Sequence, residues 1–390
     1  MAAEVNIKNT GLRGVAVADT TISFIDGVKG ILIYRGFRIE DLAANSTFPE
    51  TAYLLLNEKL PDKAELKLFE ERLRKARPLP GFILEALKRF PKDAAPMDIL
   101  QASIPLLGTA DPDLADDSRE ANQRMAVRLI SRLPGVVAAW HRIRQGLEPL
   151  EPDDSLGHAA NFLWQLHGRR PEAKTAKDLD VCLILHADHT FNASTFACRE
   201  VVSTRAHMYA GVTAGVGALS GSLHGGANAR VMEMLLKLDK EKDVAGWVRE
   251  ELNAGRRIMG IGHAVYKTMD PRGPILKEMG LRLGESTGQP EWAEMSGLVE
   301  KTALAELAKK GKGELRPNVD FFSAPVYHVM GIGRDLMTTI FAISRVAGWC
   351  AHIIEEKFGG AHGKPALYRP KAEYVGNYCG LMGCEYKPRD

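Results

Sequence analysis

Apolar residues recur at spacings of three and four along most of this chain, which is the pattern of helices that bury one face. The clearest helical segments are residues 48–57, 64–76, 98–107, 118–132, 176–185, 208–223 and 335–356. Helices are expected to stop at proline- and glycine-rich breaks, which are Pro61, 78–81, Pro91, 134–135 and Pro152. A short N-terminal hairpin is predicted by two β-rich runs, residues 21–25 and 31–34. Few β-rich runs alternate with the helices, so the pattern predicts an almost all-α fold rather than a parallel-sheet α/β fold.

The polar pattern changes between residues 228 and 316, where lysine and glutamate become frequent and helices are expected to be short and solvated. A single apolar helix resumes at residue 335. This arrangement favours a smaller helical domain inserted into a larger one. We place the large helical domain at residues 1–224 and 326–390, and the small helical domain at residues 225–325.

Charge and composition narrow the possible partners. The chain has 390 residues, and its 51 Lys and Arg nearly balance its 49 Asp and Glu. No overall field therefore favours nucleic acid or an acidic membrane, and a small anionic substrate has to be met by local arginines. The stretch 208–223 is the only apolar candidate for a membrane span, but it is short and interrupted by glycines, which suits a core or subunit-interface helix.

The cysteines indicate the compartment. Five cysteines are an odd number spread thinly through a long chain, which favours reduced thiols in the cytoplasm over a disulfide scaffold. Residues 1–14 show neither the apolar core of a signal peptide nor the pattern of a transit peptide. We therefore expect a cytoplasmic protein.

The first candidate for chemistry is His224, which lies close to the end of an uncharged stretch over residues 206–229 and is followed by Gly225 and Gly226. A titratable imidazole where the chain turns out of an apolar helix is well placed for proton chemistry. The alternative is a hydrogen-bonded histidine that caps a core helix.

A second cluster, His186-Ala187-Asp188-His189, follows an apolar run. On a helix, His186 and His189 would share one face, so a metal site is a natural interpretation. However, the spacing is not that of the H-E-x-x-H motif, and no third ligand is evident.

The run Gly260-Ile261-Gly262-His263 is followed by Lys267 and Arg272. Glycines before a histidine allow the backbone to lie against a ligand, and free amides there could meet a phosphate or adenine group. An ordinary junction between a loop and a helix is the alternative.

Two further segments carry candidate functional residues. Asp320 has apolar neighbours, which would raise its pKa and suit a general base, although an aspartate there could instead cap a helix. Phe341 and Arg345 are four residues apart on one helix, so Arg345 could bind a carboxylate beside the flat face of the Phe341 ring. An interfacial salt bridge is the alternative for Arg345.

Together these motifs resemble the citrate synthase family in its shorter prokaryotic form, over essentially the whole chain. The motifs that carry the resemblance occur in the order 186–189 with 192–194, 223–228, 260–266 with 270–272, 317–320, 341–345 and 369–370. The resemblance implies an almost all-helical homodimer whose subunits each have a large and a small domain with the active site between them. It also implies no NADH regulation, because the extra N-terminal domain of the NADH-inhibited form is absent.

Carried over residue by residue, the resemblance assigns three catalytic groups. His224 would hold the thioester carbonyl of acetyl-CoA, Asp320 would remove a methyl proton, and His263 would protonate the keto oxygen of oxaloacetate. The residues implied in oxaloacetate binding are His189, Arg272, Phe341, Arg345 and, from the partner subunit, Arg369. The residues implied in CoA binding are Gly260, Ile261, Gly262 and Lys267. No metal and no further cofactor is implied.

The implied function is citrate synthase, which condenses acetyl-CoA with oxaloacetate and hydrolyses citryl-CoA at the entry to the tricarboxylic acid cycle. The near alternative is 2-methylcitrate synthase, whose propionyl-CoA differs by one methylene, worth about 1–3 kcal/mol of discrimination. More distant alternatives are a metal-dependent hydrolase using His186, Asp188 and His189, and a non-catalytic helical scaffold. Ile261 and Ala264 depart from the Phe and Arg found in many bacterial relatives, which affects the expected CoA contacts.

Overall fold

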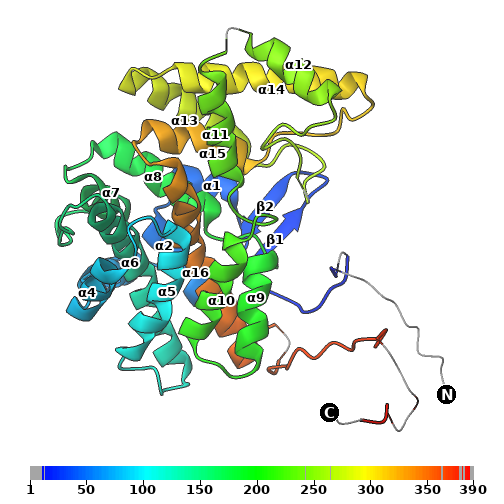
Figure 1. Ribbon diagram of the computed structural model, residues 1–390. Coiled ribbons are helices and arrows are strands. Elements are labelled where there is room, and N and C mark those ends of the chain that lie inside the picture. Colours follow the sequence, from blue (N-terminus) through cyan, green and yellow to red (C-terminus); the bar gives the residue numbers. More distant parts are fainter. Residues whose placement is uncertain are drawn as a thin grey trace.

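The computed structural model describes residues 11–12, 14–241, 243–263, 265–361, 363–376, 380 and 383–386. Within these residues the chain forms sixteen α-helices, one 3-10 helix and a three-stranded sheet (Figure 1). The first ten helices are α1 Ile39–Asn45, α2 Phe48–Asn57, α3 Lys63–Ala76, α4 Gly81–Arg89, α5 Pro96–Thr109, α6 Arg119–Arg144, α7 His158–His167, α8 Ala173–His186, α9 Ala193–Ser203 and α10 Met208–Ser220. The others are α11 Ala227–Leu238, α12 Val244–Asn253, α13 Arg272–Thr287, α14 Glu291–Lys309, α15 Val319–Val329, the 3-10 helix Arg334–Leu336 and α16 Met337–Phe358.

The predicted N-terminal hairpin is confirmed and carries a short third strand. β1 Ser23–Asp26 pairs antiparallel with β2 Ile31–Tyr34, which pairs antiparallel with β3 Phe37–Arg38. The side chain of Asp26 accepts hydrogen bonds from the amides of Val28 and Lys29, which closes the turn. The tip then rests on the loop after His263, because the Lys267 amide donates to the Gly27 carbonyl over 2.8 Å.

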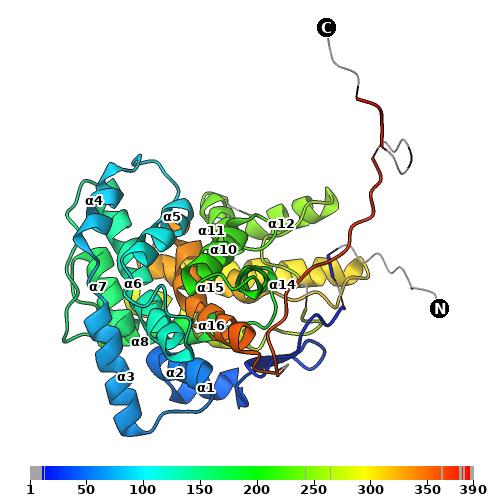
Figure 2. The ribbon, with the colours of Figure 1, turned by 90° about the horizontal axis from the view of Figure 1, so that it is seen from below.

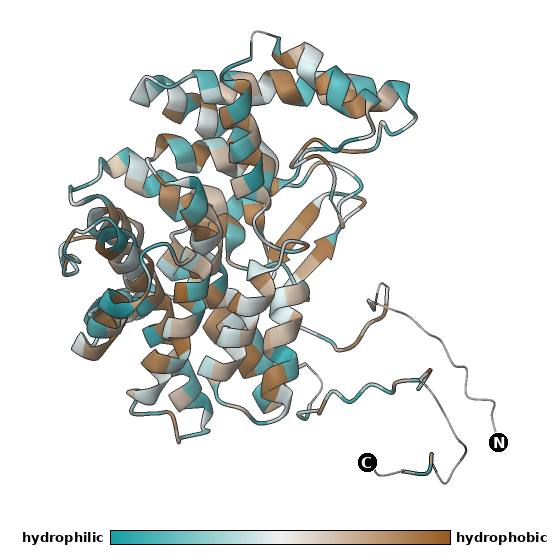
Figure 3. Cartoon of the chain, in the orientation of Figure 1, coloured by the Kyte–Doolittle hydropathy of each residue, from teal (hydrophilic) through white to brown (hydrophobic). Residues whose placement is uncertain are grey.

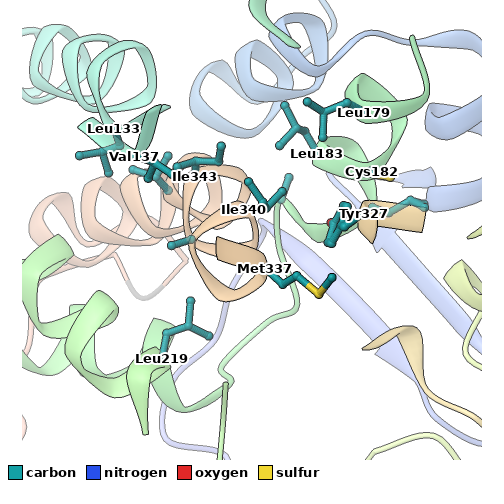
Figure 4. Close-up of a cluster of buried hydrophobic side chains, with 14 of the residues drawn as sticks. Leu133, Val137, Leu179, Cys182, Leu183, Leu219, Tyr327, Met337, Ile340 and Ile343 are labelled. Carbon is teal, nitrogen blue, oxygen red and sulfur yellow. The ribbon is translucent and has the colours of Figure 1, made fainter. Parts of the chain in front are cut away.

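Helix α16 forms the centre of the molecule, as Figure 1 shows, with α2, α5, α6, α8, α9 and α10 packed around it. Its apolar side chains Met337, Ile340 and Ile343 lie against residues from α6, α8, α10 and α15 (Figure 4). Nearly all residues of α16 are buried, including the charged Arg345 and Glu356, which explains why its sequence shows so little polar periodicity.

Among the described residues, the segment Arg334–Phe358 alone is long and apolar enough to cross a membrane, and 94% of an apolar 18-residue stretch within it is buried inside the protein. It is therefore accounted for as the core helix. The stretch 208–223, the apolar candidate for a membrane span in the sequence, contains the 13-residue helix α10.

One predicted helix boundary is wrong. The break at Pro134 and Gly135 was expected to end a helix, but α6 runs through both residues to Arg144. A buried proline costs a helix about 3 kcal/mol, and apolar burial along α6 outweighs that cost. Val136, Val137, Ala138 and Trp140 are all buried immediately beyond the break.

The glycines of α10 allow close packing within the chain. A Cβ atom at Gly211 would lie 2.7 Å from Val202, and one at Gly215 would lie 2.5 Å from the Cys198 sulfur. These glycines therefore bring α10 against α9 and α16 of the same subunit. The other edge of α10, including Ala214 and Ala218, is only partly buried.

Helices α11 to α15 gather at one end of the molecule (Figure 1), and α12 and α14 mix hydrophilic with hydrophobic residues around their surfaces (Figure 3). The predicted domain boundaries at residues 224/225 and 325/326 stay a prediction.

Cys182, Cys198 and Cys350 are free and buried, whereas Cys384 is disulfide-bonded. The expectation of reduced thiols throughout is therefore wrong at Cys384, because the spacing of cysteines along a chain does not determine which of them meet.

Candidate active site

His224 lies in a tight turn between α10 and α11 that only glycine allows. A Cβ atom at Gly225 would lie 1.9 Å from the carbonyl oxygen of Leu219, and Gly226 has a φ of +74°. The His224 amide closes the turn by donating to the Gly221 carbonyl over 2.9 Å. The two glycines thus return the chain sharply and direct the imidazole toward the start of α9.

The hydrogen bonds of His224 determine which ring nitrogen carries the proton. The backbone N–H of Ser194 donates to His224 Nε2 over 3.2 Å, and the Ser194 hydroxyl lies 2.9 Å from the same atom. Because an amide N–H can only donate, Nε2 is the acceptor and the proton of the neutral ring is on Nδ1. Burial, with the charge of Arg345 adding to it, lowers the pKa of His224 to about 4, so the ring is neutral at pH 7.

The glycine-rich segment 260–262 pairs with residues 316–318. The Gly262 amide donates to the Arg316 carbonyl over 2.8 Å, and the Asn318 amide donates to the Gly260 carbonyl over 2.9 Å. This pairing places His263 beside the start of α15, which carries Asp320. The Ile261 and Gly262 amides are both hydrogen-bonded, so the expectation of free amides for a phosphate is wrong at these two residues.

His263 presents the opposite ring nitrogen from His224. Its Nδ1 accepts hydrogen bonds from the amides of Val265 and Tyr266, over 2.9 and 3.0 Å. The proton of the neutral ring is therefore on Nε2, which lies 4.0 Å from Asp270 Oδ2. Burial and then the charge of Arg272 lower the pKa of His263 to about 4. Both histidines are thus neutral groups, each with one N–H that no described residue accepts.

Asp320 lies in the first turn of α15 but does not cap it. Asn318 is the cap, and its side chain accepts from the amides of Asp320 and Phe321. The carboxylate of Asp320 is therefore not used as a cap. Burial raises its pKa to about 6, while Arg272 opposes the shift and Asp270 adds to it. A carboxylate with this pKa is ionised at pH 7 and is a stronger base than an exposed one.

Two buried arginines face the same region. The guanidinium of Arg345 lies 4.5 Å from the ring centroid of Phe341, as predicted from their spacing, and its Nε donates to the His186 carbonyl over 2.7 Å. Arg272 is held by Asp270 through two hydrogen bonds, of 2.9 Å from Nε and 2.7 Å from Nη2. Within the described part of the chain the terminal nitrogens of Arg345 have no hydrogen-bond partner, so both are available for a substrate carboxylate, whereas Arg272 keeps mainly Nη1.

His189 is buried among these groups. Its ring centroid lies 5.7 Å from that of His263 and 5.6 Å from that of Tyr266. Its Nε2 is buried without a hydrogen-bond partner among the described residues. Burial and then the charges of Arg272 and Arg345 lower its pKa, so it is a neutral group that a ligand could contact.

The prediction that His186 and His189 share one helix face is wrong. Helix α8 ends at His186, whose Nδ1 bonds the Cys182 carbonyl and whose ring packs against Phe341. Asp188 is engaged by Ser23 and His352. In the described part of the chain no group of three or more His, Cys, Asp or Glu is arranged to hold a metal ion.

Comparisons with known proteins agree with this geometry. A sequence model of the family described as "Citrate synthase, C-terminal domain" matches residues 11–371. The chain is 44% identical over 367 residues to Citrate synthase 2 of Bacillus subtilis, covering 94% of this chain and 95% of that protein.

The chain belongs to the citrate synthase family.

Two further proteins of known name are also similar to this chain. It is 39% identical over 367 residues to the 2-methylcitrate synthase of Mycobacterium tuberculosis, covering 94% of this chain and 90% of that protein. The solved ternary complex of Thermoplasma acidophilum citrate synthase with carboxymethyl-coenzyme A and oxaloacetate is similar with a TM-score of 0.86 at 30% identity, covering 95% of this chain and 97% of that chain. The predicted family, the almost all-α fold and the enzyme class, an acyltransferase of the citrate (Si)-synthase type, are confirmed.

Two predicted site residues of this citrate synthase family member lie apart from the others. Lys267 is exposed beside the hairpin tip. Arg369 is exposed on the extended segment that leaves the body after α16, drawn in red in Figure 1 and seen from below in Figure 2. Their predicted roles in binding CoA and the partner's oxaloacetate stay predictions.

Sequence reasoning missed two residues that orient the site. Ser194 sets the tautomer of His224 from 30 positions away, and it was noted as part of a motif without a role. Asp270 holds Arg272 and lies two residues before it, so an acidic residue close to a predicted carboxylate clamp was the available signal.

Proposed function

We propose that the protein condenses acetyl-CoA with oxaloacetate and hydrolyses the resulting citryl-CoA to citrate and CoA. One observation carries the proposal. Two neutral histidines, His224 and His263, each keep one N–H free, in the same site as a carboxylate, Asp320, whose pKa is raised to about 6. Forming a carbon–carbon bond from a thioester needs one base and two neutral proton donors of this kind.

The first step makes the thioester methyl carbon a nucleophile. Asp320 takes a methyl proton, and the electrons of that C–H bond move into the thioester to form the enol. His224 Nδ1–H donates to the thioester oxygen, where negative charge develops. A preorganised donor in a site that excludes water accelerates such a step by about 10²–10³. A neutral imidazole suits this role, because the buried site disfavours a charged ring and the neutral ring still has one N–H to donate.

The second step joins the two substrates. The enol carbon attacks the keto carbon of oxaloacetate, and the keto oxygen takes a proton from Nε2 of His263. The thioester carbonyl re-forms as the proton on its oxygen returns to Nδ1 of His224. Water then cleaves the thioester of citryl-CoA, releasing CoA and citrate. Giving up this proton leaves negative charge on the His263 ring, which the nearby positive charge of Arg272 stabilises.

Arg272, Arg345 and His189 bind oxaloacetate in this proposal. The guanidinium of Arg345 rests on Phe341 and is almost completely buried, so its position is fixed before substrate arrives. Planar guanidinium groups match carboxylates better than lysine does, because they donate two parallel hydrogen bonds. The Thermoplasma acidophilum enzyme of the same fold binds oxaloacetate and a CoA analogue, which supports this pair of substrates.

A homodimer completes the site, with Arg369 reaching oxaloacetate in the partner subunit. The exposed position of Arg369 on an extended segment that leaves the body supports this assignment (Figure 2). Gly260, Ile261, Gly262 and Lys267 bind CoA in this proposal, in which the exposed side chain of Lys267 supplies the positive charge. A cytoplasmic location and the absence of a metal or further cofactor stay predictions.

The test of acyl specificity is a direct comparison of two thioesters. The purified protein, with oxaloacetate and either acetyl-CoA or propionyl-CoA, is followed by release of the CoA thiol. We expect kcat/KM to be higher for acetyl-CoA by about tenfold or more, the value of one methylene in a fitted pocket. A higher kcat/KM for propionyl-CoA would replace the proposal with 2-methylcitrate synthase.

Two controls exclude the distant alternatives. Exhaustive chelation should leave CoA release unchanged, whereas a metal-dependent hydrolase would lose activity. His224→Ala and Asp320→Ala should each abolish condensation and keep the helical circular-dichroism spectrum. If either variant stayed fully active, the catalytic assignment would be wrong.

A further inference from the structure

Tyr368 is the residue before Arg369, and it attaches the extended segment to the body of the protein. Its ring meets Phe196 of α9 edge-on, with the centroids 5.5 Å apart. Its hydroxyl donates to Glu356 Oε2 of α16 over 3.0 Å, and its amide lies 3.4 Å from the Ser203 hydroxyl. One half-buried side chain therefore contacts two helices, immediately before the exposed arginine.

The acceptor of this hydrogen bond is itself fixed. Glu356 is 1% exposed and pairs with Arg199 over 2.7 Å. Arg199 is completely buried, pairs with Glu355 over 2.7 Å and lies 4.4 Å from the ring centroid of Phe191. A buried ion pair held on several sides cannot shift without a large loss of stability. Glu356 therefore gives Tyr368 a rigid attachment point.

The bend before Tyr368 is also constrained. Gly359, the residue after the end of α16, has a φ of +70°, and a Cβ atom there would lie 2.5 Å from the backbone of Lys364. The chain thus folds back on itself and leaves the helix in one direction. With both the bend and Tyr368 fixed, the position at which Arg369 emerges is fixed relative to α16.

We propose that Tyr368 is a positioning residue, which holds the extended segment so that Arg369 reaches oxaloacetate in the partner subunit. The proposal rests on the cross-subunit role of Arg369 proposed above. An arginine on a free segment would lose chain and side-chain entropy on binding each substrate molecule. The attachment of Tyr368 removes part of that loss before substrate arrives.

The same buried cluster also leads to the subunit's own site, which gives a competing explanation. Arg199 Nη1 lies 3.2 Å from His352 Nδ1, and His352 Nε2 lies 3.2 Å from Asp188 Oδ1. Asp188 precedes His189, so a change at Tyr368 could reach His189 through the cluster instead of through Arg369. The experiment has to separate these two routes.

The test is a double-mutant cycle between Tyr368→Phe and Arg369→Ala in the full chain, with steady-state kinetics for both substrates. Tyr368→Phe keeps the ring on Phe196 and removes the hydrogen bond to Glu356. We expect it to raise KM for oxaloacetate about three- to tenfold, the effect of one ordinary lost hydrogen bond, because Tyr368 acts on oxaloacetate only through Arg369, and to leave KM for acetyl-CoA unchanged. In the Arg369→Ala background the same substitution should have no further effect.

Tyr53→Phe is the matched control, because it removes a tyrosine hydroxyl from α2, away from the extended segment. It should leave both KM values unchanged. An equal rise in KM for oxaloacetate in both backgrounds would overturn the proposal in favour of the route through His352. No rise on Tyr368→Phe, with a clear rise on Arg369→Ala, would overturn it and leave the role of Arg369 intact. No rise on Arg369→Ala would overturn both.

Discussion

At the scale of single residues, the site depends on which nitrogen of each histidine carries the proton. His224 accepts at Nε2 and His263 accepts at Nδ1, in each case from backbone amides. Motif reasoning identified both histidines but could not assign their tautomers, since these depend on amides brought close by the fold. Ser194, which starts the helix beside His224, is the residue that makes this assignment testable.

Replacing Ser194 with alanine should lower kcat about tenfold and leave KM for oxaloacetate nearly unchanged. The substitution removes the hydroxyl at 2.9 Å from Nε2 and keeps the weaker amide contact at 3.2 Å. It also leaves the Trp349 indole N–H without its partner, so the free energy of unfolding should fall by about 1–3 kcal/mol. Ser103→Ala is the control, because that buried hydroxyl bonds the Ile99 carbonyl inside α5. If both variants had equal kcat, Ser194 would not orient His224.

The raised pKa of Asp320 predicts how the rate depends on pH. A general base has to be ionised, so kcat/KM for acetyl-CoA should rise about tenfold per pH unit below about 6 and level off above it. His224 and His263, with pKa values of about 4, should add no further limb between pH 5 and 8. A stopped assay over pH 5–8 checks this profile. A flat profile would show that Asp320 titrates well below pH 5 in the free enzyme.

The same shift predicts that Asp320 costs stability at neutral pH. Its pKa is raised from 3.8 to about 6, so the ionised form is disfavoured in the folded state. The cost is absent below pH 3.8, grows between pH 3.8 and 6, and is complete above 6, where about two pKa units correspond to ~2–3 kcal/mol. Asp320→Asn should therefore raise Tm more at pH 8 than at pH 5, while abolishing condensation. An equal Tm change at both pH values would contradict the shift.

At the scale of elements, the helices that bury one face or all faces were predicted well, and so were the breaks, except the one at Pro134. The predicted segments 48–57 and 335–356 correspond to α2 and α16 within two residues at each end, because their apolar pattern decides burial directly. The stop at Pro134 failed because a local signal cannot reveal how much apolar area a helix buries beyond it. The pairing of 260–262 with 316–318 was also invisible, since more than 50 residues separate its two sides.

This pairing yields a prediction with an internal control. Gly260 and Gly255 have nearly equal φ values of +77° and +76°, but a Cβ atom at Gly260 would lie 2.8 Å from both Phe321 and Val231, whereas Gly255 has open space. Gly255→Ala should cost only the left-handed backbone strain of about 1 kcal/mol and retain full kcat. Gly260→Ala should cost more and also lower kcat, because the clash separates His263 from Asp320. Urea unfolding and kcat of the two variants check this difference.

At the scale of the whole molecule, one subunit holds every proposed catalytic group, yet one proposed substrate ligand lies on the extended segment after α16. His224, His263 and Asp320 come from α10 to α15 of one chain, while Arg369 lies on the segment that leaves the body (Figure 1). No pattern within a single chain reports which surface meets a second copy. The dimer therefore has to be tested as an assembly.

Mixed dimers decide whether Arg369 acts across the interface. An Arg369→Ala subunit keeps its own catalytic groups, and a His224→Ala subunit keeps Arg369. Co-refolding equal amounts should therefore create one intact site in each mixed dimer and restore about a quarter of wild-type activity, since half of the dimers are mixed and each holds one intact site of two. Mixing His224→Ala with Asp320→Ala should restore nothing, because both groups belong to one chain. If the first mixture stayed as inactive as the second, Arg369 would serve its own subunit and the extended segment would have to fold back over it.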